Sequence, residues 1–456
     1  MSHHWAVDAI FYHIYPLGFC DAPEHNDFTS APVPRLAKIE TWLDHLQTLG
    51  INALYLGPVF ESTAHGYDTA DYYHVDRRLG NDADLARLVQ ACHARGMRVI
   101  LDGVFNHVGR HFWAFRDLQQ YGEHSAYRDW FHRINFTERS PYGDPFSYEG
   151  WSGHYDLVKL NLQNPAVKQH LLQAVAHWVE AFAIDGLRLD VADSLDKGFL
   201  HELAQHGRGL RPDFWLMGEV IHGNYTAWAN PTMLDAVTNY EAYKGLYSSL
   251  NDRNYFEIAH TLKRQFASGG IYEHLPLYNF ADNHDVHRVA STLREPAYLP
   301  LVYTLLFTMP GVPSLYYGSE WGLPGQRTAH SDRPLRPSLN LAVMQATPQQ
   351  PGLAEFIARL ARIRHNSLSL RYGDLREVSV ASEQYVFMRS WDGETSLVLL
   401  NAAAERVELS CSVALPDGIR LTDLLAPEET FWVSNGRVHN VPLQPRQARI
   451  LSSVAR

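Results

Sequence analysis

The hydrophobic positions of this chain alternate between short apolar runs, typical of buried strands, and longer segments with helical periodicity. Apolar runs fall at residues 10–16, 53–60, 98–107, 186–193, 214–220, 236–242, 277–285 and 314–317. Residues 35–50, 82–95 and 166–182 instead repeat apolar positions at roughly helical spacing, and Gly50 and Gly96 are stop signals for the first two. Such alternation indicates parallel strands joined by right-handed helical crossovers. The pattern predicts an α/β fold, a (β/α)8 TIM barrel.

One interval between predicted strands is too long for a simple crossover. Residues 108–160 separate the third strand from its helix and are rich in aromatic side chains. We predict a short insertion after strand 3 that overhangs the barrel mouth. Its rings either form the core of this small unit, which is the commoner fate of a single ring, or stack on substrate, with Trp113, Tyr148 and Trp151 as candidates.

The pattern changes after about residue 366. Residues 384–390, 395–401, 406–412 and 448–452 form short apolar runs separated by turn residues. These predict a C-terminal antiparallel β-sandwich. The expected organisation is a barrel from residues 1–107 and 161–366, an insertion at 108–160 and the sandwich at 367–456.

Composition narrows the classes of partner. The net charge of −11 argues against nucleic acid and against an anionic membrane as partners, and no stretch is apolar enough to span a bilayer. Cys20, Cys92 and Cys411 lie far apart, which argues against a disulfide framework or a thiolate zinc site. The N-terminus lacks a basic segment followed by an apolar run, so we expect a cytoplasmic protein; a secreted form that has lost its signal peptide is the alternative. The oligomeric state is not indicated.

Two carboxylates, Asp190 and Glu219, end consecutive predicted strands. Barrels of this kind carry their chemistry at the carboxyl ends of their strands. Arg188 lies two residues before Asp190 and therefore on the same face of the strand, where we expect it to lower the pKa of Asp190 and keep it ionised as a nucleophile. Glu219 would donate the proton, and a separation of about 5–5.5 Å would give retention of configuration at a glycosidic bond. A purely structural Asp190–Arg188 ion pair is the alternative.

Further polar residues end other predicted strands. Asp285 closes the segment FADNHD at 280–285, beside His284, and His107 closes DGVFNH at 102–107. Each motif is weak evidence when taken alone. Four strand ends that carry such groups favour a functional site at that end of the barrel.

The chain resembles the α-amylase family, glycoside hydrolase family 13. The resemblance rests on ordered motifs that span residues 8–365: HGYDTADYYHVD (65–76), DGVFNH (102–107), GLRLDVAD (186–193), GEV (218–220), FADNHD (280–285) and PGVPSLYYGSE (310–320). The segment LVKLN at 157–161 is similar to the form found in the neopullulanase and cyclomaltodextrinase branch. That branch's N-terminal starch-binding module is not expected, because the predicted barrel starts near residue 8.

The resemblance implies roles for individual residues. Asp190 matches the catalytic nucleophile, Glu219 the general acid/base and Asp285 the stabiliser of the transition state. Polar or stacking contacts with the sugar are implied for Tyr67, Asp68, His107, Arg188 and His284. No cofactor is required for this chemistry.

Some positions depart from the family pattern. Asp193–Ser194 stand where many members have Lys-His, so contacts on the product side are not carried over. Asn106 matches a ligand of a structural calcium ion in many members, which makes calcium an open alternative here. In the loop at 327–336, we expect Asp332 and Arg336 to form a solvated salt bridge rather than to contact substrate.

Together these features predict a retaining α-glucan hydrolase that cleaves α-1,4 links in maltodextrins, cyclodextrins or starch. A transglycosylase or an α-1,6-acting enzyme with the same mechanism is the close alternative, since the same carboxylates serve both. A catalytically silent carbohydrate-binding or scaffold protein on this fold is the alternative from another class. Intact acids at all three strand ends argue against it.

Overall fold

The computed structural model describes residues 4–329 and 331–453, so residues 1–3 of the predicted barrel and 454–456 of the predicted sandwich lie outside the described residues. Eight parallel strands form its central sheet, in the order β10-β11-β1-β2-β3-β7-β8-β9. A parallel bridge between Thr238 and Tyr278 joins the two edges, so the sheet closes into the predicted (β/α)8 barrel. The strands are β1 (Phe11–Ile14), β2 (Ala53–Leu56), β3 (Arg98–Gly103), β7 (Gly186–Leu189), β8 (Trp215–Gly218), β9 (Ala236–Val237), β10 (Tyr278–Phe280) and β11 (Val312–Tyr316).

Alternation along each strand separates two apolar clusters. Inward side chains such as Phe11, Ile100 and Trp215 fill the barrel centre. Outward side chains such as Leu54 and Leu187 pack with the surrounding helices. Because both faces are buried, the strands need continuous apolar sequence, which explains why they were recognisable as apolar runs.

Two predicted elements differ in the structure. Residues 35–50 form two helices, α2 (Ala37–Glu40) and α3 (Leu43–Leu49), because the buried indole of Trp42 packs against Phe19 and Trp321 at the break. The strand predicted at 236–242 ends at Val237, and helix α8 (Tyr240–Asn251) begins where the Asn239 side chain caps it by accepting the Ala242 N–H. Helices α4 (Asp82–His93) and α6 (Pro165–Phe182) agree closely with their predicted positions.

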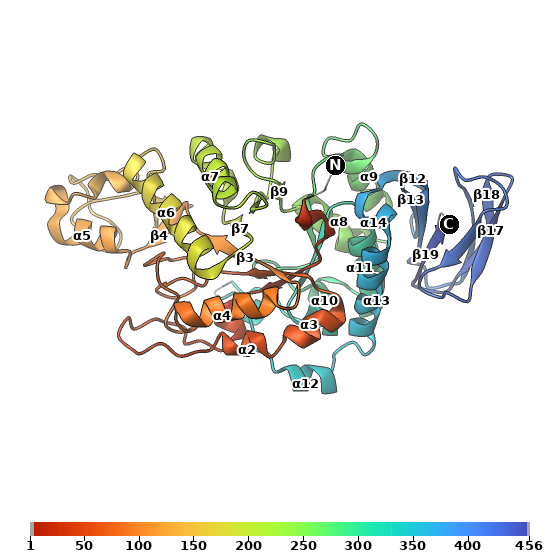
Figure 1. Ribbon diagram of the computed structural model, residues 1–456, viewed down its shortest axis with the longest axis horizontal. Helices are drawn as coiled ribbons and strands as arrows, with labels where there is room; N and C mark the ends of the chain where they lie inside the picture. Colours follow the sequence, from red (N-terminus) through yellow and green to blue (C-terminus); the bar gives the residue numbers. More distant parts are fainter. Residues whose placement is uncertain (1–3, 330, 454–456) are drawn as a thin grey trace.

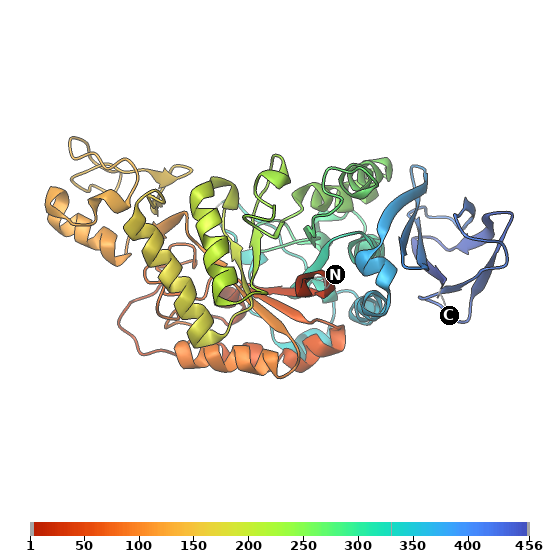
Figure 2. The ribbon, with the colours of Figure 1, turned by 45° about the horizontal axis from the view of Figure 1, so that its top comes forward.

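The insertion after the third barrel strand projects from one end of the molecule, beside α6 and away from the C-terminal domain (Figures 1 and 2). It contains α5 (Trp113–Tyr121) and a three-stranded antiparallel sheet in the order β4-β6-β5. These strands are β4 (His107–Gly109), β5 (Gly150–Trp151) and β6 (His154–Lys159). Buried rings form its core: Phe112, Phe115, Phe131, Phe146 and Tyr148. The alternative of a small aromatic core therefore holds for most of these side chains.

The C-terminal domain is the predicted antiparallel sandwich. Helices α13 (Leu353–Asn366) and α14 (Leu368–Tyr372) lead into it. Its eight strands are hydrogen-bonded in one continuous order, β12-β13-β14-β19-β16-β17-β18-β15, and the sheet folds over an apolar core. The first half, here called the first layer, contains β12 (Asp374–Val380), β13 (Gln384–Trp391), β14 (Glu394–Asn401) and β19 (Gln447–Ser453). The second half, the second layer, contains β15 (Val407–Ser412), β16 (Arg420–Asp423), β17 (Thr430–Ser434) and β18 (Arg437–Leu443), and β16 joins the halves by pairing with β19.

The first layer of the sandwich is buried on both faces. Tyr385 and Phe387 on β13 join the apolar cluster of the barrel helices. Val386, between them, faces the second layer. This layer also contacts α9 (Phe256–Phe266) and α11 (Leu299–Thr308), so the sandwich is fixed against the side of the barrel (Figure 1).

Among residues 4–329 and 331–453, no helix combines the length and apolarity that crossing a bilayer requires.

Candidate active site

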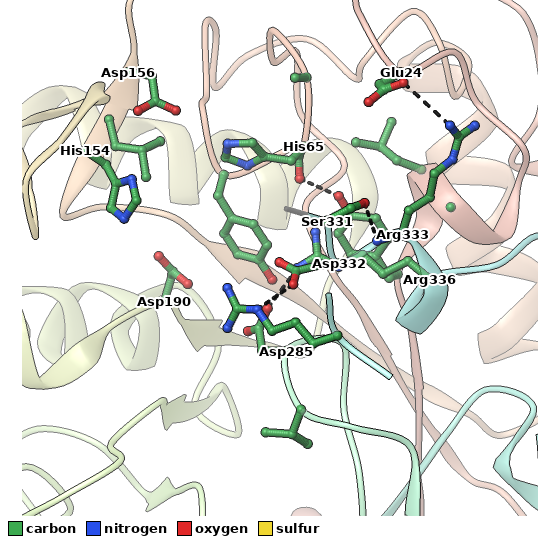
Figure 3. A pocket seen from close by; sticks show the side chains of 18 of the residues that line it. Glu24, His65, His154, Asp156, Asp190, Asp285, Ser331, Asp332, Arg333 and Arg336 are labelled. Atoms are coloured by element: carbon green, nitrogen blue, oxygen red, sulfur yellow. Dashed lines mark hydrogen bonds and ion pairs between the residues drawn. The ribbon is translucent and has the colours of Figure 1, made fainter. Parts of the chain in front are cut away.

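The carboxyl ends of the barrel strands open into a cavity of about 960 Å³. Figure 3 shows Asp190 and Asp285 facing this cavity, with His154 and Asp156 of the insertion on one side of it. Five of the predicted site residues line the cavity: Tyr67, His107, Asp190, Glu219 and Asp285. The four others do not line it and are described below: Asp68, Asn106, Arg188 and His284.

Asp190 and Glu219 contact the same guanidinium. Asp190 directly follows β7 and Glu219 directly follows the neighbouring β8. Arg188 Nη1 donates to Asp190 Oδ1 at 2.9 Å, and its Nη2 lies 2.8 Å from Glu219 Oε2. Nη1 also donates to both carboxylate oxygens of Asp102, at 2.8 and 3.0 Å, because strand register sets Asp102 opposite Arg188. Three carboxylates therefore share one buried guanidinium at one end of the barrel.

Burial governs the ionisation of Asp190. Loss of hydration raises the pKa of its carboxyl well above the usual range; Arg188 opposes this shift, and Glu219 and Asp102 add to it. Arg188 lowers the pKa of Asp190, as expected, but a guanidinium shared by three carboxylates does not offset the burial, so the net shift is upward. The Asp190 carboxyl therefore binds a proton at a higher pH than an isolated aspartate would.

The residue after Asp190 is strained and holds Glu219. Val191 adopts a left-handed backbone conformation with φ 40° and ψ 49°, which is rare for a β-branched residue. Its N–H donates to Glu219 Oε2 at 3.1 Å, the same oxygen that faces Arg188. The other oxygen, Oε1, lies 3.3 Å from the Tyr240 hydroxyl. A proton on Glu219 therefore belongs on Oε1, since Oε2 already faces two donors.

Asp285 lies in the opposite electrostatic environment. Its Oδ1 accepts a hydrogen bond from Arg336 Nη2 at 2.8 Å, and its Oδ2 lies 2.9 Å from His284 Nε2. Burial opposes its ionisation, but His284 and Arg336 outweigh the burial and hold the pKa of Asp285 far below its usual value. The site thus places Asp285, whose pKa is lowered, beside Asp190, whose pKa is raised, and such a division of carboxyl pKa values is suited to acid–base chemistry.

His107 presents an N–H to the cavity. Asn106 Nδ2 lies 3.1 Å from His107 Nδ1, which leaves the ring proton on Nε2. Nε2 has no hydrogen-bond partner among the described residues and lies 3.8 Å from Asp190 Oδ2. Burial, with a smaller contribution from His65, lowers the pKa of His107 to about 3. His107 is therefore a neutral donor at physiological pH.

The surroundings of Asn106 do not fit a calcium ion. Calcium prefers six to eight oxygen ligands, several of them carboxylates. The Asn106 amide is directed at His107 and its backbone carbonyl accepts the Leu160 N–H, while its buried Oδ1 has no partner among the described residues. In the part of the chain that the structure describes, no group of three His, Cys, Asp or Glu side chains is placed to hold a metal ion. We therefore assign Asn106 to the positioning of His107.

Tyr67 and Asp68 are neighbours with different surroundings. The Tyr67 hydroxyl contacts His284 Nε2 and donates to Asp102 Oδ2 at 3.0 Å, and its ring stacks on His284 at a centroid distance of 5.4 Å. Asp68 Oδ2 instead accepts the Ala64 N–H at 2.8 Å. Asp68, expected to contact substrate, is therefore reassigned to the turn at 64–68, because its carboxylate satisfies the turn's backbone rather than the cavity.

Sequence reasoning missed two residues of this network. Asp102 could have been found as a site residue, because it belongs to the same motif as His107 and pairs with Arg188 in strand register. The contact of Arg336 with Asp285 carried no signal, because the two lie 51 residues apart along the chain. The expected ion pair of Arg336 with Asp332 is present at 3.4 Å, but it is not solvated: the Arg336 side chain is 12% exposed, packs over the Tyr15 ring and makes its shorter contact, 2.8 Å, with Asp285.

The insertion contributes one aromatic ring to the cavity. Trp151, on β5, lines it with its ring centroid 5.6 Å from that of His107. Tyr148 is buried and its hydroxyl donates to the Tyr155 carbonyl, so it belongs to the core. Trp113 is partly exposed but packs edge-on against Trp130 and does not line the cavity.

Comparison with known proteins agrees with this geometry. Residues 13–349 match the α-amylase catalytic domain. A cyclomaltodextrinase from a Bacillus species is 32% identical over 441 residues, which cover 91% of this chain and 76% of the relative. Neopullulanase 2 of Thermoactinomyces vulgaris is 32% identical over 478 aligned positions, covering 98% and 78%.

Among solved structures, cyclic α-maltosyl-(1→6)-maltose hydrolase from Arthrobacter globiformis superposes with a TM-score of 0.82 at 28% identity. The match covers 99% of this chain and 100% of that one. A family match over most of the barrel, together with acids gathered at its carboxyl end, identifies the chain as a member of the α-amylase family of glycoside hydrolases.

Proposed function

We propose that this chain is a retaining α-glucan hydrolase that cleaves α-1,4-glucosidic bonds in maltodextrins, cyclodextrins or starch. One observation carries the proposal: Asp190 and Glu219 contact two nitrogens of one guanidinium and face one cavity, with the ionised Asp285 beside them. Two carboxyl groups held this closely leave little room for a water molecule between one of them and the sugar, which favours direct attack on the anomeric carbon.

In the first step, the Glu219 proton passes from Oε1 to the glycosidic oxygen. Asp190 attacks the anomeric carbon as the bond to that oxygen breaks, and a covalent glycosyl-enzyme forms. In the second step, Glu219 takes a proton from water, the water oxygen attacks the same carbon, and Asp190 leaves as a carboxylate. Arg188 then faces the charge that returns to Asp190.

Three further residues are assigned to the sugar that is attacked. His107 Nε2–H is placed to donate to a hydroxyl near Asp190. Asp285, fixed by His284 and Arg336, accepts hydroxyl hydrogen bonds that strengthen as positive charge develops on the ring. The ring of Tyr67, which lines the cavity, offers an apolar contact for the sugar's C–H face.

Product analysis tests the proposal. Incubation with maltoheptaose and β-cyclodextrin should release malto-oligosaccharides, and proton NMR during the first turnovers should show the α-anomer. Initial release of the β-anomer would overturn the retaining mechanism. A lack of products from both substrates would overturn the assignment to α-1,4 links.

A second candidate is hydrolysis of α-1,6 links in small cyclic or branched malto-oligosaccharides. It is favoured by the full-length match to the Arthrobacter globiformis hydrolase, which is named for cyclic α-maltosyl-(1→6)-maltose, whereas the cyclomaltodextrinase relative extends well beyond the match. Digestion of pullulan separates the two, because α-1,4 cleavage yields panose and α-1,6 cleavage yields maltotriose.

Transfer of the glycosyl group to a second sugar instead of water remains part of the same proposal, since the carboxylates serve both acceptors.

A cytoplasmic location is also proposed. The three cysteines are free and buried, which is compatible with a reducing compartment.

A further inference from the structure

A second cavity, of about 1080 Å³, lies between the barrel and the C-terminal domain and is here called the seam cavity. On the barrel side it is lined by His274, which precedes β10, and Pro310, which precedes β11. Asp285 of the active site follows the same strand β10 at its other end. Because all barrel strands are parallel, the seam cavity lies at the end of the barrel opposite the catalytic carboxylates.

An aromatic pair forms one wall of the seam cavity. Trp391 ends β13 and Tyr372 ends α14, and their ring centroids lie 5.6 Å apart. Trp391 is 39% exposed, whereas Tyr385 and Phe387 on the same strand are fully buried against the barrel. The indole therefore offers an apolar face where β13 leaves the core.

The backbone holds this indole in a fixed position. Asp392 and Gly393, with φ 46° and φ 82°, form the two-residue turn between β13 and β14 and so pair Trp391 with Glu394. The Glu394 carboxylate accepts the N–H groups of Leu368 and Ser369 at the start of α14. The helix that ends in Tyr372 and the hairpin that ends in Trp391 are thus tied together before any ligand binds, which lowers the ordering cost of binding.

Polar groups of both charges surround the aromatic wall. Four carboxylate side chains and one guanidinium line the seam cavity: Glu273, Asp374, Asp392, Glu394 and Arg420. This acidic balance disfavours an anionic ligand. A neutral ligand with an apolar face and many hydroxyl groups matches this lining, since hydroxyls both donate and accept.

We propose that the seam cavity is a second, non-catalytic binding site for an α-glucan chain, with Trp391 as the stacking surface. The choice of ligand rests on the proposed function of the active site, which requires glucans to be present around the enzyme. A site at the opposite end of the barrel would hold a long glucan on the enzyme without occupying the catalytic cavity.

The test uses full-length Asp190→Asn protein, so that the polymer is not degraded, and measures retardation in native gels that contain amylopectin. Trp391→Ala in this background should weaken amylopectin binding at least tenfold, and Arg420→Ala should weaken it by a smaller factor. Trp432→Ala is the matched control, because Trp432 is 58% exposed on β17 but does not line the seam cavity. It should leave binding unchanged.

A second measurement separates the two sites. In otherwise wild-type protein, Trp391→Ala should leave kcat/KM on maltotriose unchanged, and thermal unfolding checks that the domain is intact. Unchanged amylopectin retardation in Trp391→Ala, or no retardation of the parent, overturns the seam-cavity proposal while hydrolysis of glucans still supports the proposed function. If retardation depends on Trp391 but the wild-type protein hydrolyses no glucan, the proposed function is refuted and the seam-cavity proposal stands.

Discussion

Replacement of His107 by Asn tests whether burial keeps this donor neutral. His107 is 1% exposed, its pKa is lowered to about 3, and its Nε2 lies 3.8 Å from Asp190 Oδ2. If its N–H bonds a sugar hydroxyl, the variant loses one neutral hydrogen bond, about 1.5 kcal/mol or roughly tenfold in kcat/KM. The pKa fixes how that factor depends on pH.

With a pKa of about 3, His107 stays neutral throughout pH 5–8. The ratio of kcat/KM between parent and variant should therefore remain constant across this range on maltoheptaose. A histidine with an ordinary pKa of about 6.5 would be only about 3% neutral at pH 5, and the ratio would then change by about 30-fold. Ionisation of Asp190 and Glu219 does not change this ratio of kcat/KM, because it affects the parent and the variant alike. A ratio that drifts tenfold or more between pH 8 and pH 5 would refute the reasoning.

The same shift affects stability with a definite sign. The folded-state pKa of His107 is below its unfolded value, so the unfolded chain binds more protons between pH 6.5 and about 3, and stability is lost as the pH falls through that window. At pH 4.5 the loss from this group is about 2.5 kcal/mol relative to pH 7. Urea unfolding should show that His107→Asn is less acid-sensitive than the parent by about this amount, since the lost packing costs the same at both pH values.

Three further predictions concern the carboxylates and the domain contact. Asp190→Asn and Glu219→Gln should each lower turnover by several orders of magnitude, and Glu219→Gln should still accumulate a glycosyl-enzyme, visible by mass spectrometry, from a substrate with a good leaving group; absence of that adduct would contradict the role of Asp190. Asp102→Asn should move the acidic limb of the pH–rate profile to lower pH, because Asp190 must be ionised to attack and the charge of Asp102 is one of the groups that raise its pKa; an unmoved limb would count against the shared-guanidinium network. Phe387→Ala should lower the free energy of unfolding by about 3–5 kcal/mol in urea titrations, because its ring is fully buried against the barrel helices, whereas the exposed Trp432→Ala should change it by less than about 0.5 kcal/mol; equal effects would contradict the packing argument.

Local pattern was sufficient for the main elements of the fold and for the position of the acids. Barrel strands buried on both faces need continuous apolar sequence, so strands such as β2 and β7 were visible as apolar runs. The acids Asp190 and Glu219 directly follow such runs, and parallel strands bring their carboxyl ends to one face. The break at Trp42 was not visible, because the rings that bury its indole come from distant parts of the chain.

The order of residues alone is therefore enough to infer the class of fold, the end of the barrel that carries the chemistry, and most of the polar residues gathered there. How these residues share charge depends on contacts that form only in the folded chain. Arg336 reaches Asp285 across 51 residues of chain, and one Arg188 serves three carboxylates, so Asp285 ionises easily while Asp190 resists ionisation. Such differences depend on burial and on distances through space, which no spacing along the chain encodes.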